Sequence, residues 1–325
     1  MKWSEPKNVL RCEAVIFDID NVLIDTQRSY LEAIRQTVDI YLTEGTVPLF
    51  RPTRSKGSLT LLSENDVNQF KLLGGFNDDW DCCYGILQYL LALPVHKRTM
   101  EELKRLMDFK QLARETKNRP LGVAGIIRKF GRSTAVKIEK IARIFQEIYL
   151  GHRLFPIVEK NHPQYWNKLG FIQRERLIFK KKILEKLKKN GLALGIATGR
   201  SRFEASYGLQ KFGIAHFFDA ITHADDVKKA EREAKQSLRK PHPYSILKTA
   251  KKLGEGKVFF YVGDLPDDIL AANRSKESLR IYSVAFPAYS ATGPAAFREI
   301  EKAQPDFIIQ KPRELVPLAL SKLSQ

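Results

Sequence analysis

Short apolar runs alternate with amphipathic segments through the C-terminal half of the chain, and few folds accommodate that alternation. The runs 192–197 and 257–262 predict strands buried on both faces, and helical spacing over 202–212 and 267–274 predicts connecting helices. Parallel strands need connections of this kind. One more apolar run, Ala14–Phe17, stands apart near the N-terminus. We therefore predict an α/β fold with a three-layer, Rossmann-like parallel sheet as its core.

A long insert with a different pattern separates the first apolar run from this alternating region. No strand signal stands out between Arg28 and Leu169. Apolar residues recur there at the spacing of amphipathic helices, over 28–42, 65–73, 79–93, 100–116 and 133–150. We therefore predict an all-helical domain over 27–174, inserted into an α/β core made of 1–26 and 175–325.

The composition is that of an ordinary globular protein. Hydrophobic residues make up 43% and charged residues 28% of the 325 residues, and no apolar run approaches the length that spans a bilayer. The three cysteines, Cys12, Cys82 and Cys83, are too few for a disulfide framework. The N-terminus lacks the apolar stretch of a signal peptide. We expect a cytoplasmic protein with no membrane partner.

Polar clusters follow the predicted strands or lie in loops beside them. Ligands of open α/β sheets bind just beyond the carboxyl ends of the strands. We therefore expect one site built from four clusters, namely Asp18-Ile19-Asp20, Thr198-Gly199-Arg200, Lys240-Pro241-His242-Pro243 and Gly263-Asp264-Leu265-Pro266-Asp267-Asp268.

The first cluster places two carboxylates, Asp18 and Asp20, on the same side of an extended strand. Once the chain turns at Asn21, the two groups can do different work near one centre. One can attack phosphorus, and the other can protonate the leaving oxygen and later activate water. This pair predicts phosphoryl transfer through a carboxylate nucleophile.

The other clusters supply the groups that such a reaction needs. Asp264 and Asp268 offer hard oxygen ligands, which together with retained waters suit magnesium. Thr198 offers a hydroxyl to a phosphoryl oxygen, and Lys240 offers a cation that neutralises developing charge. We therefore expect Mg²⁺ as the cofactor.

The four clusters resemble, in order and spacing, the four motifs of the haloacid dehalogenase superfamily. Asp18–Leu23 is similar to its first motif, DxDx(T/V)(L/I), and Thr198 to the hydroxyl residue of the second. Lys240 is similar to the third-motif lysine, and Gly263–Asp268 resembles the fourth motif, GDxxxD. The resemblance covers 14–29 and roughly 177–320, and it points to the phosphoglycolate phosphatase-like members of subfamily IA.

This resemblance implies roles for the first and fourth clusters. Asp18 would be the nucleophile and Asp20 the general acid and base. Magnesium would be held by Asp18, by the backbone carbonyl region of Ile19 and Asp20, and by Asp264, with Asp268 in support.

The resemblance also implies a helical cap directly after the first motif, as in phosphoglycolate phosphatases and β-phosphoglucomutases, although this insert is about twice the usual size. Within it, the stretch Gly74–Asp81 resembles an Asn-Asp-Trp stretch of an uncharacterised phosphatase-like subfamily. We predict that Asn77, Asp78 and Trp80 contact the substrate. The alternative for Asp78 is that it caps the following helix.

In the core we predict substrate contacts from Asn21, Gly199 and Arg200. Asn21 replaces the usual glycine of the first motif and can adopt the same backbone with little strain. For Arg200 two interpretations stay open: contact with the substrate phosphate, or neutralisation of Asp264.

The third-motif lysine is also open. Lys240 is preferred because Pro241-His242-Pro243 follows it, and Lys228 or Lys229 is the alternative because a basic stretch intervenes after Asp226.

Taken together, these residues predict a magnesium-dependent phosphatase that hydrolyses a small phosphorylated metabolite through an aspartyl-phosphate. A phosphomutase of the β-phosphoglucomutase type would use the same two aspartates. The net charge of +18 motivates another alternative, a nucleic-acid-binding protein or a phosphatase of nucleic-acid ends. Because the basic residues interleave with apolar ones at helical spacing, solvated helix faces are the simpler interpretation.

Overall fold

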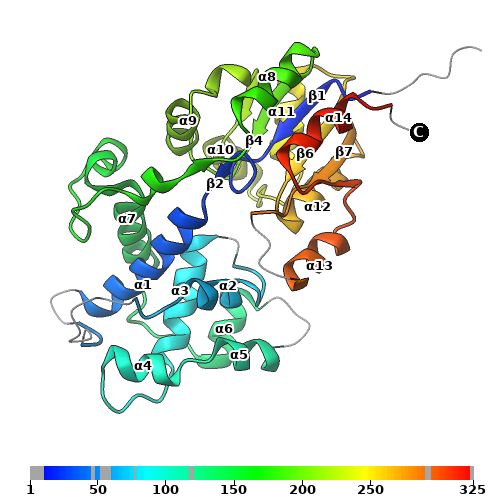
Figure 1. Cartoon of the computed structure of the whole chain (residues 1–325). Helices are drawn as coiled ribbons and strands as arrows, with labels where there is room; N and C mark the ends of the chain where they lie inside the picture. The colour runs from blue at the N-terminus through cyan, green and yellow to red at the C-terminus, as the bar shows by residue number, and fades with distance from the viewer. Residues whose placement is uncertain are drawn as a thin grey trace, which may run out of the picture. The chain divides into compact units, whose positions relative to one another are not determined.

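The computed structural model describes residues 11–44, 48–51, 60–76, 78–116, 121–289 and 294–322 (Figure 1). The chain divides into two compact units. The first unit comprises Met1–Asp25 and Arg176–Gln325, and the second comprises Thr26–Glu175.

A six-stranded sheet forms the centre of the first unit. Its strand order is β5-β4-β1-β6-β7-β8, and every neighbouring pair is parallel. In that order the strands are Ala220–Thr222, Ala193–Ala197, Ala14–Phe17, Val258–Gly263, Arg280–Ala285 and Phe307–Ile308. The predicted α/β fold with a parallel sheet is therefore confirmed.

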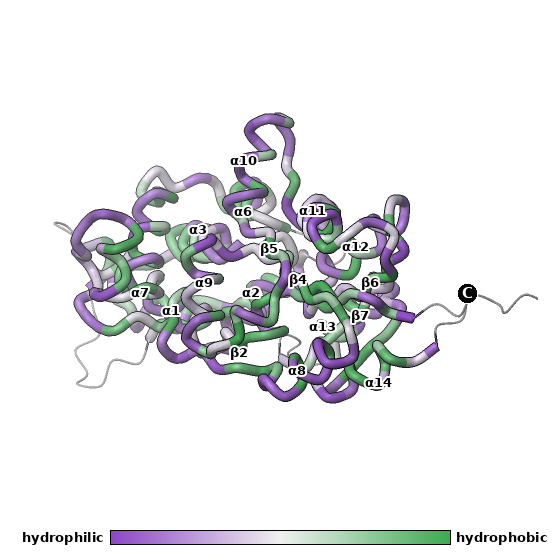
Figure 2. The backbone as a smooth tube through the Cα atoms, turned by 90° about the horizontal axis from the view of Figure 1, so that it is seen from above, coloured by the Kyte–Doolittle hydropathy of each residue, from purple (hydrophilic) through white to green (hydrophobic). Residues whose placement is uncertain are grey.

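Helices cover both faces of this sheet, which explains why its strands are apolar throughout. Val15 and Phe17 of β1 point into a core shared with three helices, and Ala14 and Ile16 point into the opposite core, shared with two. The helices of the first core are α8 (Lys181–Lys189), α9 (Arg202–Lys211) and α14 (Leu315–Leu320), and those of the second are α11 (Tyr244–Leu253) and α12 (Pro266–Ser275). In Figure 2 the strands carry the hydrophobic colour.

Two further helices complete the described part of this unit. α13 (Pro294–Lys302) places Ile300 against Ile269 of α12. α10 (Ala224–Ala234) follows β5 and is largely hydrophilic (Figure 2). A short antiparallel pair joins β2 (Ile24–Asp25) to β3 (Arg176–Leu177), and one-turn helices span Ala215–Phe217 and Pro312–Glu314.

The second unit is helical, as far as the structure describes it. Its central helix, α3 (Asp79–Leu91), has nine consecutive buried residues, Cys82–Leu90, so other elements surround it. Around it lie α1 (Glu32–Thr43), α2 (Glu64–Lys71), α4 (Met100–Leu106), α5 (Phe109–Glu115), α6 (Gly122–Phe130) and α7 (Ile138–Glu159), with short helical turns at Gln27–Leu31 and Phe171–Arg174.

Two helix predictions in this unit were wrong in detail. The expected helix over 100–116 is interrupted, because the backbone is extended at Met107 and at Asp108, which caps α5 by accepting the N–H of Gln111. The helix expected from residue 133 begins only at Ile138, and α6 precedes it. Local helix propensity cannot decide where these helices begin or end, because packing against other buried residues sets their boundaries.

Close backbone packing bends α7 at Gly151. This residue has φ +73°, and a Cβ there would lie 2.0 Å from the backbone nitrogen of Gly170. Four residues earlier, the fully buried Glu147 accepts N–H groups from Gln164 and Tyr165. The carboxylate therefore holds the loop after α7 against the helix.

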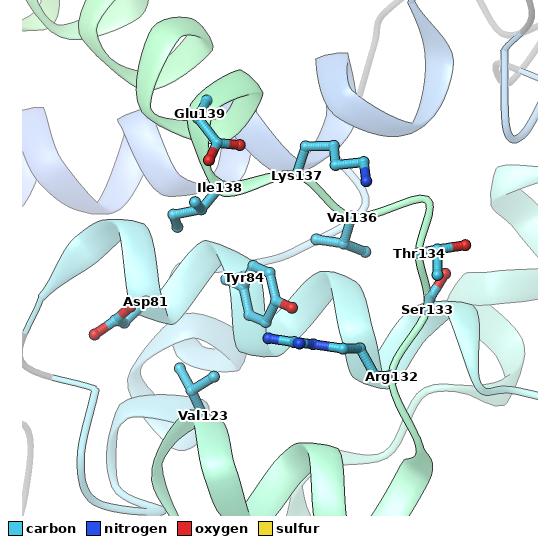
Figure 3. A pocket seen from close by; sticks show the side chains of 10 residues that line it. All are labelled: Asp81, Tyr84, Val123, Arg132, Ser133, Thr134, Val136, Lys137, Ile138 and Glu139. Atoms are coloured by element: carbon cyan, nitrogen blue, oxygen red, sulfur yellow. The ribbon is translucent and has the colours of Figure 1, made fainter.

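A cavity of about 420 Å³ opens where α3, α6 and α7 begin (Figure 3). Tyr84, Arg132 and Val136 point toward its middle in Figure 3. The wall also includes acidic, basic and hydroxyl side chains, namely Asp81, Glu139, Lys137, Ser133 and Thr134.

Across the described residues, every helix is too short or too polar to serve as a transmembrane span.

Candidate active site

Three of the four polar clusters meet at one edge of the sheet. Asp18 follows β1, Thr198 follows β4, and Asp264 follows β6. Since β1 lies between β4 and β6 and all three run parallel, their carboxyl ends are adjacent. The remaining cluster, the third along the chain, reaches the same place through Lys240, in the loop between α10 and α11.

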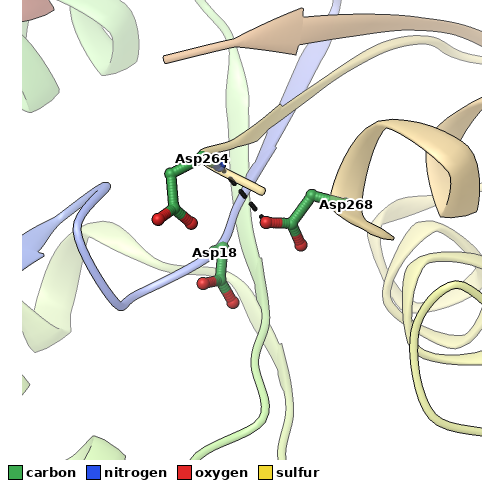
Figure 4. A group of neighbouring side chains, drawn as sticks. All are labelled: Asp18, Asp264 and Asp268. Atoms are coloured by element: carbon green, nitrogen blue, oxygen red, sulfur yellow. Dashed lines mark hydrogen bonds between the residues drawn. The ribbon is translucent and has the colours of Figure 1, made fainter. Parts of the chain in front are cut away.

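The acidic groups of the first and fourth motifs form one buried cluster. Carboxylate oxygens of Asp18, Asp264 and Asp268 lie within 4.8 Å of one another, and the three residues are at most 6% exposed (Figure 4). Oxygen donors at this spacing fit a small divalent cation such as magnesium, which favours carboxylate ligands and keeps some of its waters. The donor set therefore matches the cofactor expected from the sequence.

Local hydrogen bonds fix Asp268 in the cluster. Its Oδ2 accepts the backbone N–H groups of Asp264 and Leu265 at 3.2 Å, and its Oδ1 accepts the hydroxyl of Tyr261 at 2.8 Å. Gly263 makes this approach possible, because a Cβ there would lie 2.3 Å from the Cβ of Asp268. The start of α12 is thereby packed directly on the end of β6.

Lys240 supplies the counter-charge. Its Nζ lies 2.8 Å from Oδ1 of Asp18 and 2.8 Å from Oδ1 of Asp268. Lys228 and Lys229, the alternatives from the sequence, are exposed on α10. The loop that carries Lys240 is held by Arg274, whose Nη1 donates to the carbonyl of Pro241 at 2.9 Å.

Burial and charge perturb the protonation of these groups. Burial raises the pKa of Asp18 to about 7, although Lys240 opposes the shift. Burial also acts to raise the pKa of Asp268, but Lys240 and the Tyr261 hydroxyl outweigh it and hold that pKa below its ordinary value. Burial acts to lower the pKa of Lys240, and the two carboxylates reverse this, so Lys240 stays charged.

The turn after β1 brings Asp20 near the cluster. Asn21 has φ +54°, the left-handed conformation that asparagine tolerates, as expected. The carbonyl of Ile19 accepts the N–H groups of Leu23 and Ile24 at 2.9 Å each. The turn therefore already engages this oxygen, and its expected role as a metal ligand stays a prediction.

Arg200 makes a contact that the sequence interpretation missed. Its Nε and Nη2 lie 2.8 and 2.7 Å from Oδ1 of Asp20, whereas the two interpretations above directed it at the substrate phosphate or at Asp264. Its backbone N–H donates to Oγ1 of Thr198 at 3.2 Å. Gly199 between them is exposed, with open space where a Cβ would stand.

The residues of the second unit that were predicted to contact substrate are described only in part. Asn77 lies outside the described residues. Asp78 caps α3, its Oδ1 accepting the N–H groups of Trp80 at 2.9 Å and Asp81 at 3.3 Å, and Trp80 is partly exposed. Substrate contact by these residues stays a prediction.

One residue of the site gave little signal in the sequence. Tyr261 falls inside an apolar strand, where it counts as core. A tyrosine within such a run is informative in hindsight, because its buried hydroxyl needs a partner.

Comparison with known proteins agrees with this arrangement. A family model described as haloacid dehalogenase-like hydrolase matches residues 12–276. Pyrophosphatase PpaX of Bacillus cereus (strain AH820) is 28% identical over 136 residues, which cover 42% of this chain and 55% of that protein. Pyrophosphatase PpaX of Bacillus velezensis is 29% identical over 134 residues, covering 41% and 54%. The matched region thus spans about half the length of these curated relatives.

A solved structure, phosphatase Tt82 from Thermococcus thioreducens, is similar in fold with a TM-score of 0.59. Its sequence identity is 21%, and the similarity covers 94% of this chain and 98% of that one. The family model matches most of the chain, including all four polar clusters. The chain therefore belongs to the haloacid dehalogenase-like hydrolase family.

Proposed function

We propose that this hydrolase is a magnesium-dependent phosphatase that cleaves a small phosphate monoester through an aspartyl-phosphate on Asp18. The main support is the position of Asp18, a buried carboxylate at the end of β1 between the Lys240 ammonium and two further carboxylates. A buried carboxylate in such surroundings would be a poor structural choice, because desolvation penalises its charge. It suits a nucleophile that needs to be held in one place.

In the first chemical step an oxygen of Asp18 would bond to phosphorus as the bond to the leaving oxygen breaks. Asp20 would donate a proton to that leaving oxygen. In the second step Asp20 would take a proton from water, whose oxygen attacks phosphorus. The bond to Asp18 then breaks, releasing inorganic phosphate and restoring the carboxylate.

Other residues of the chain would stabilise the transferring group. The Thr198 hydroxyl accepts the N–H of Arg200, which leaves its own proton for a phosphoryl oxygen. Lys240 would neutralise charge that develops beside Asp18. Magnesium held by Asp18, Asp264 and Asp268, with the Asp20 carbonyl as a further candidate ligand, would add positive charge that keeps the carboxylates ionised and polarises the phosphoryl group.

We further propose that residues 27–174 act as the specificity domain of the enzyme, with Asn77, Asp78 and Trp80 as candidate substrate contacts. Small phosphorylated metabolites are the proposed substrate class. Inorganic pyrophosphate belongs in the first panel, because the curated relatives carry the name pyrophosphatase. The expected cytoplasmic location stays a prediction.

The test is release of inorganic phosphate from a panel of phosphate esters and pyrophosphate, with magnesium and with chelator. We expect magnesium-dependent release that Asp18→Asn abolishes. Asp219→Asn is the control, because Asp219 is half-exposed and pairs with Lys188 away from the cluster. Phosphate release that persists in Asp18→Asn would contradict the proposed nucleophile.

Two alternatives are tested by the same material. A phosphomutase would isomerise a sugar phosphate without net phosphate release. A polyanion-binding protein would bind oligonucleotides with an affinity that falls steeply with salt, as the net charge of +18 allows. If the protein does not bind oligonucleotides even at low salt, that alternative is excluded.

A further inference from the structure

Arg200 is the largest fully buried side chain of the described residues, although it carries a charge. Its side chain has no exposed surface, whereas that of its partner Asp20 is 29% exposed. Burying a guanidinium is costly unless it is paired and hydrogen-bonded. The phosphatase mechanism above assigns no chemical step to Arg200, so this cost needs another explanation.

Both the side chain and the main chain of Arg200 make hydrogen bonds. Its Nε and Nη2 converge on Oδ1 of Asp20 at 2.8 and 2.7 Å, a charge-assisted two-point contact on a single oxygen that holds this oxygen in place. Its backbone N–H donates to Thr198, and its carbonyl accepts the N–H of Ala224 at 2.9 Å. One residue therefore connects the end of β4 to the turn that follows β1.

Helix α9 leaves room for this side chain at Gly208. A Cβ at Gly208 would lie 3.4 Å from Nη1 of Arg200 and 2.9 Å from Cδ1 of Ile24, which begins β2 directly after the turn that carries Asp20. A larger residue would therefore crowd the guanidinium and the turn together. The absence of a side chain at Gly208 thus leaves space for the arginine in the orientation that contacts Asp20.

Proton transfer depends on such control of position. A general acid must come within about 2.6–3.2 Å of the oxygen that it protonates. A displacement of about 1 Å can cost about a hundredfold in rate. Asp20 sits on a tight turn with a partly exposed side chain, so its own backbone does not fix the carboxylate.

We infer, on the basis of the proposed phosphatase function, that Arg200 is a positioning residue that orients Asp20 for proton transfer and does not itself contact the phosphoryl group. The buried guanidinium acts through Asp20, and its main chain orients the Thr198 hydroxyl in the same site.

This inference predicts a dependence on the leaving group. Protonation matters most when the leaving oxygen is strongly basic, as in phenyl phosphate, and least for p-nitrophenyl phosphate, whose leaving group departs readily. In Arg200→Met we expect kcat/KM for phenyl phosphate to fall about tenfold more than kcat/KM for p-nitrophenyl phosphate. Arg200→Lys should fall between wild type and Arg200→Met, because a lysine keeps the charge but loses the two-point contact.

A second signature comes from the later step, in which Asp20 must activate water. With p-nitrophenyl phosphate we expect the Arg200 variants to lose kcat more than kcat/KM and to release a burst of p-nitrophenol before steady state. The matched control is Arg202→Met, two residues away with a side chain that is 66% exposed, which should leave the ratio between the two substrates unchanged.

The outcomes separate the two levels of the proposal. If kcat/KM in Arg200→Met and Arg200→Lys falls equally for both substrates and no burst is seen, the arginine has a merely structural role. That result overturns this inference alone. If the wild type shows no turnover that Asp18→Asn abolishes, the proposed function is overturned, and this inference with it. A leaving-group-dependent loss in both Arg200 variants supports it, including for partly folded preparations, because the fraction of active protein cancels in the ratio.

Discussion

Replacing Lys240 by methionine should destabilise the metal-free protein and at the same time tighten its binding of magnesium. The ammonium lies 2.8 Å from both Asp18 and Asp268, which are almost fully buried. Without it, the carboxylate cluster loses its counter-charge, and the pKa of Asp18, which burial already raises to about 7, rises further. The same site then attracts a divalent cation more strongly, because one competing cation has gone.

The size of both effects follows from this geometry. Breaking a buried ion pair from one side costs about 3–5 kcal/mol, since the remaining charge stays desolvated. The electrostatic gain for a cation held among oxygens within 4.8 Å of one another is at least one power of ten in Kd, about 1.4 kcal/mol, even with strong screening. Magnesium should therefore restore more stability to Lys240→Met than it adds to the wild type.

The assay is denaturant unfolding with chelator and with a magnesium titration, so it needs no substrate. Lys188→Met is the matched control, because its Nζ also lies 2.8 Å from a carboxylate, that of Asp219, but both partners are at least 34% exposed. The control should lose about 1 kcal/mol or less and respond to magnesium as the wild type does. A magnesium response in Lys240→Met that is weaker than in the wild type would refute the assignment of the cation to this cluster.

Three further predictions concern stability. Tyr261→Phe should cost about 1.5–3 kcal/mol in unfolding free energy, because Asp268 loses a hydrogen bond from a buried hydroxyl. Tyr282→Phe on β7 is the control, and an equal loss in both variants would contradict the special role of Tyr261. In thermal unfolding, Gly151→Ala should cost about 3 kcal/mol or more, because its Cβ would lie 2.0 Å from the Gly170 backbone. Gly131→Ala is the control: this glycine has φ +84° and open space around it, so the variant should cost only about 1 kcal/mol. Burial raises the pKa of Asp39 to about 6, so the folded state binds this proton more tightly than the unfolded state; the resulting stability is present at low pH and lost as pH rises through 6. From about pH 5 to about pH 7.5, Asp39→Asn should therefore gain about 1–1.5 kcal/mol relative to the wild type in urea unfolding, and a difference that stays constant with pH would contradict this.

The core of the protein was predictable because its signals are local. The apolar runs that became β1, β4 and β6 are buried on both faces, and that burial requires an unbroken apolar sequence. The polar residue after each run then had to lie at a strand end. Asp18, Thr198 and Asp264 were identified in this way, and the structure brings them to adjacent strand ends.

Within the helical insert the sequence was less informative. The helices α4 and α5 were merged into one segment, and α6 was missed, although the apolar spacing over both regions is real. Helix ends there are set by capping residues such as Asp108 and by packing around the buried α3, and periodicity alone does not contain that information.

The sequence by itself determined the α/β core, the helical insert, and which carboxylates stand at strand ends, because each of these depends on residues within a few positions of one another. Only the tertiary structure decided which groups touch. The pairing of Arg200 with Asp20 joins residues 180 positions apart, and that of Lys240 with Asp18 joins residues 222 apart. Such contacts depend on β1 lying between β4 and β6 and on the loop before α11 returning to that edge. Strand order is a property of the folded sheet that local periodicity does not encode.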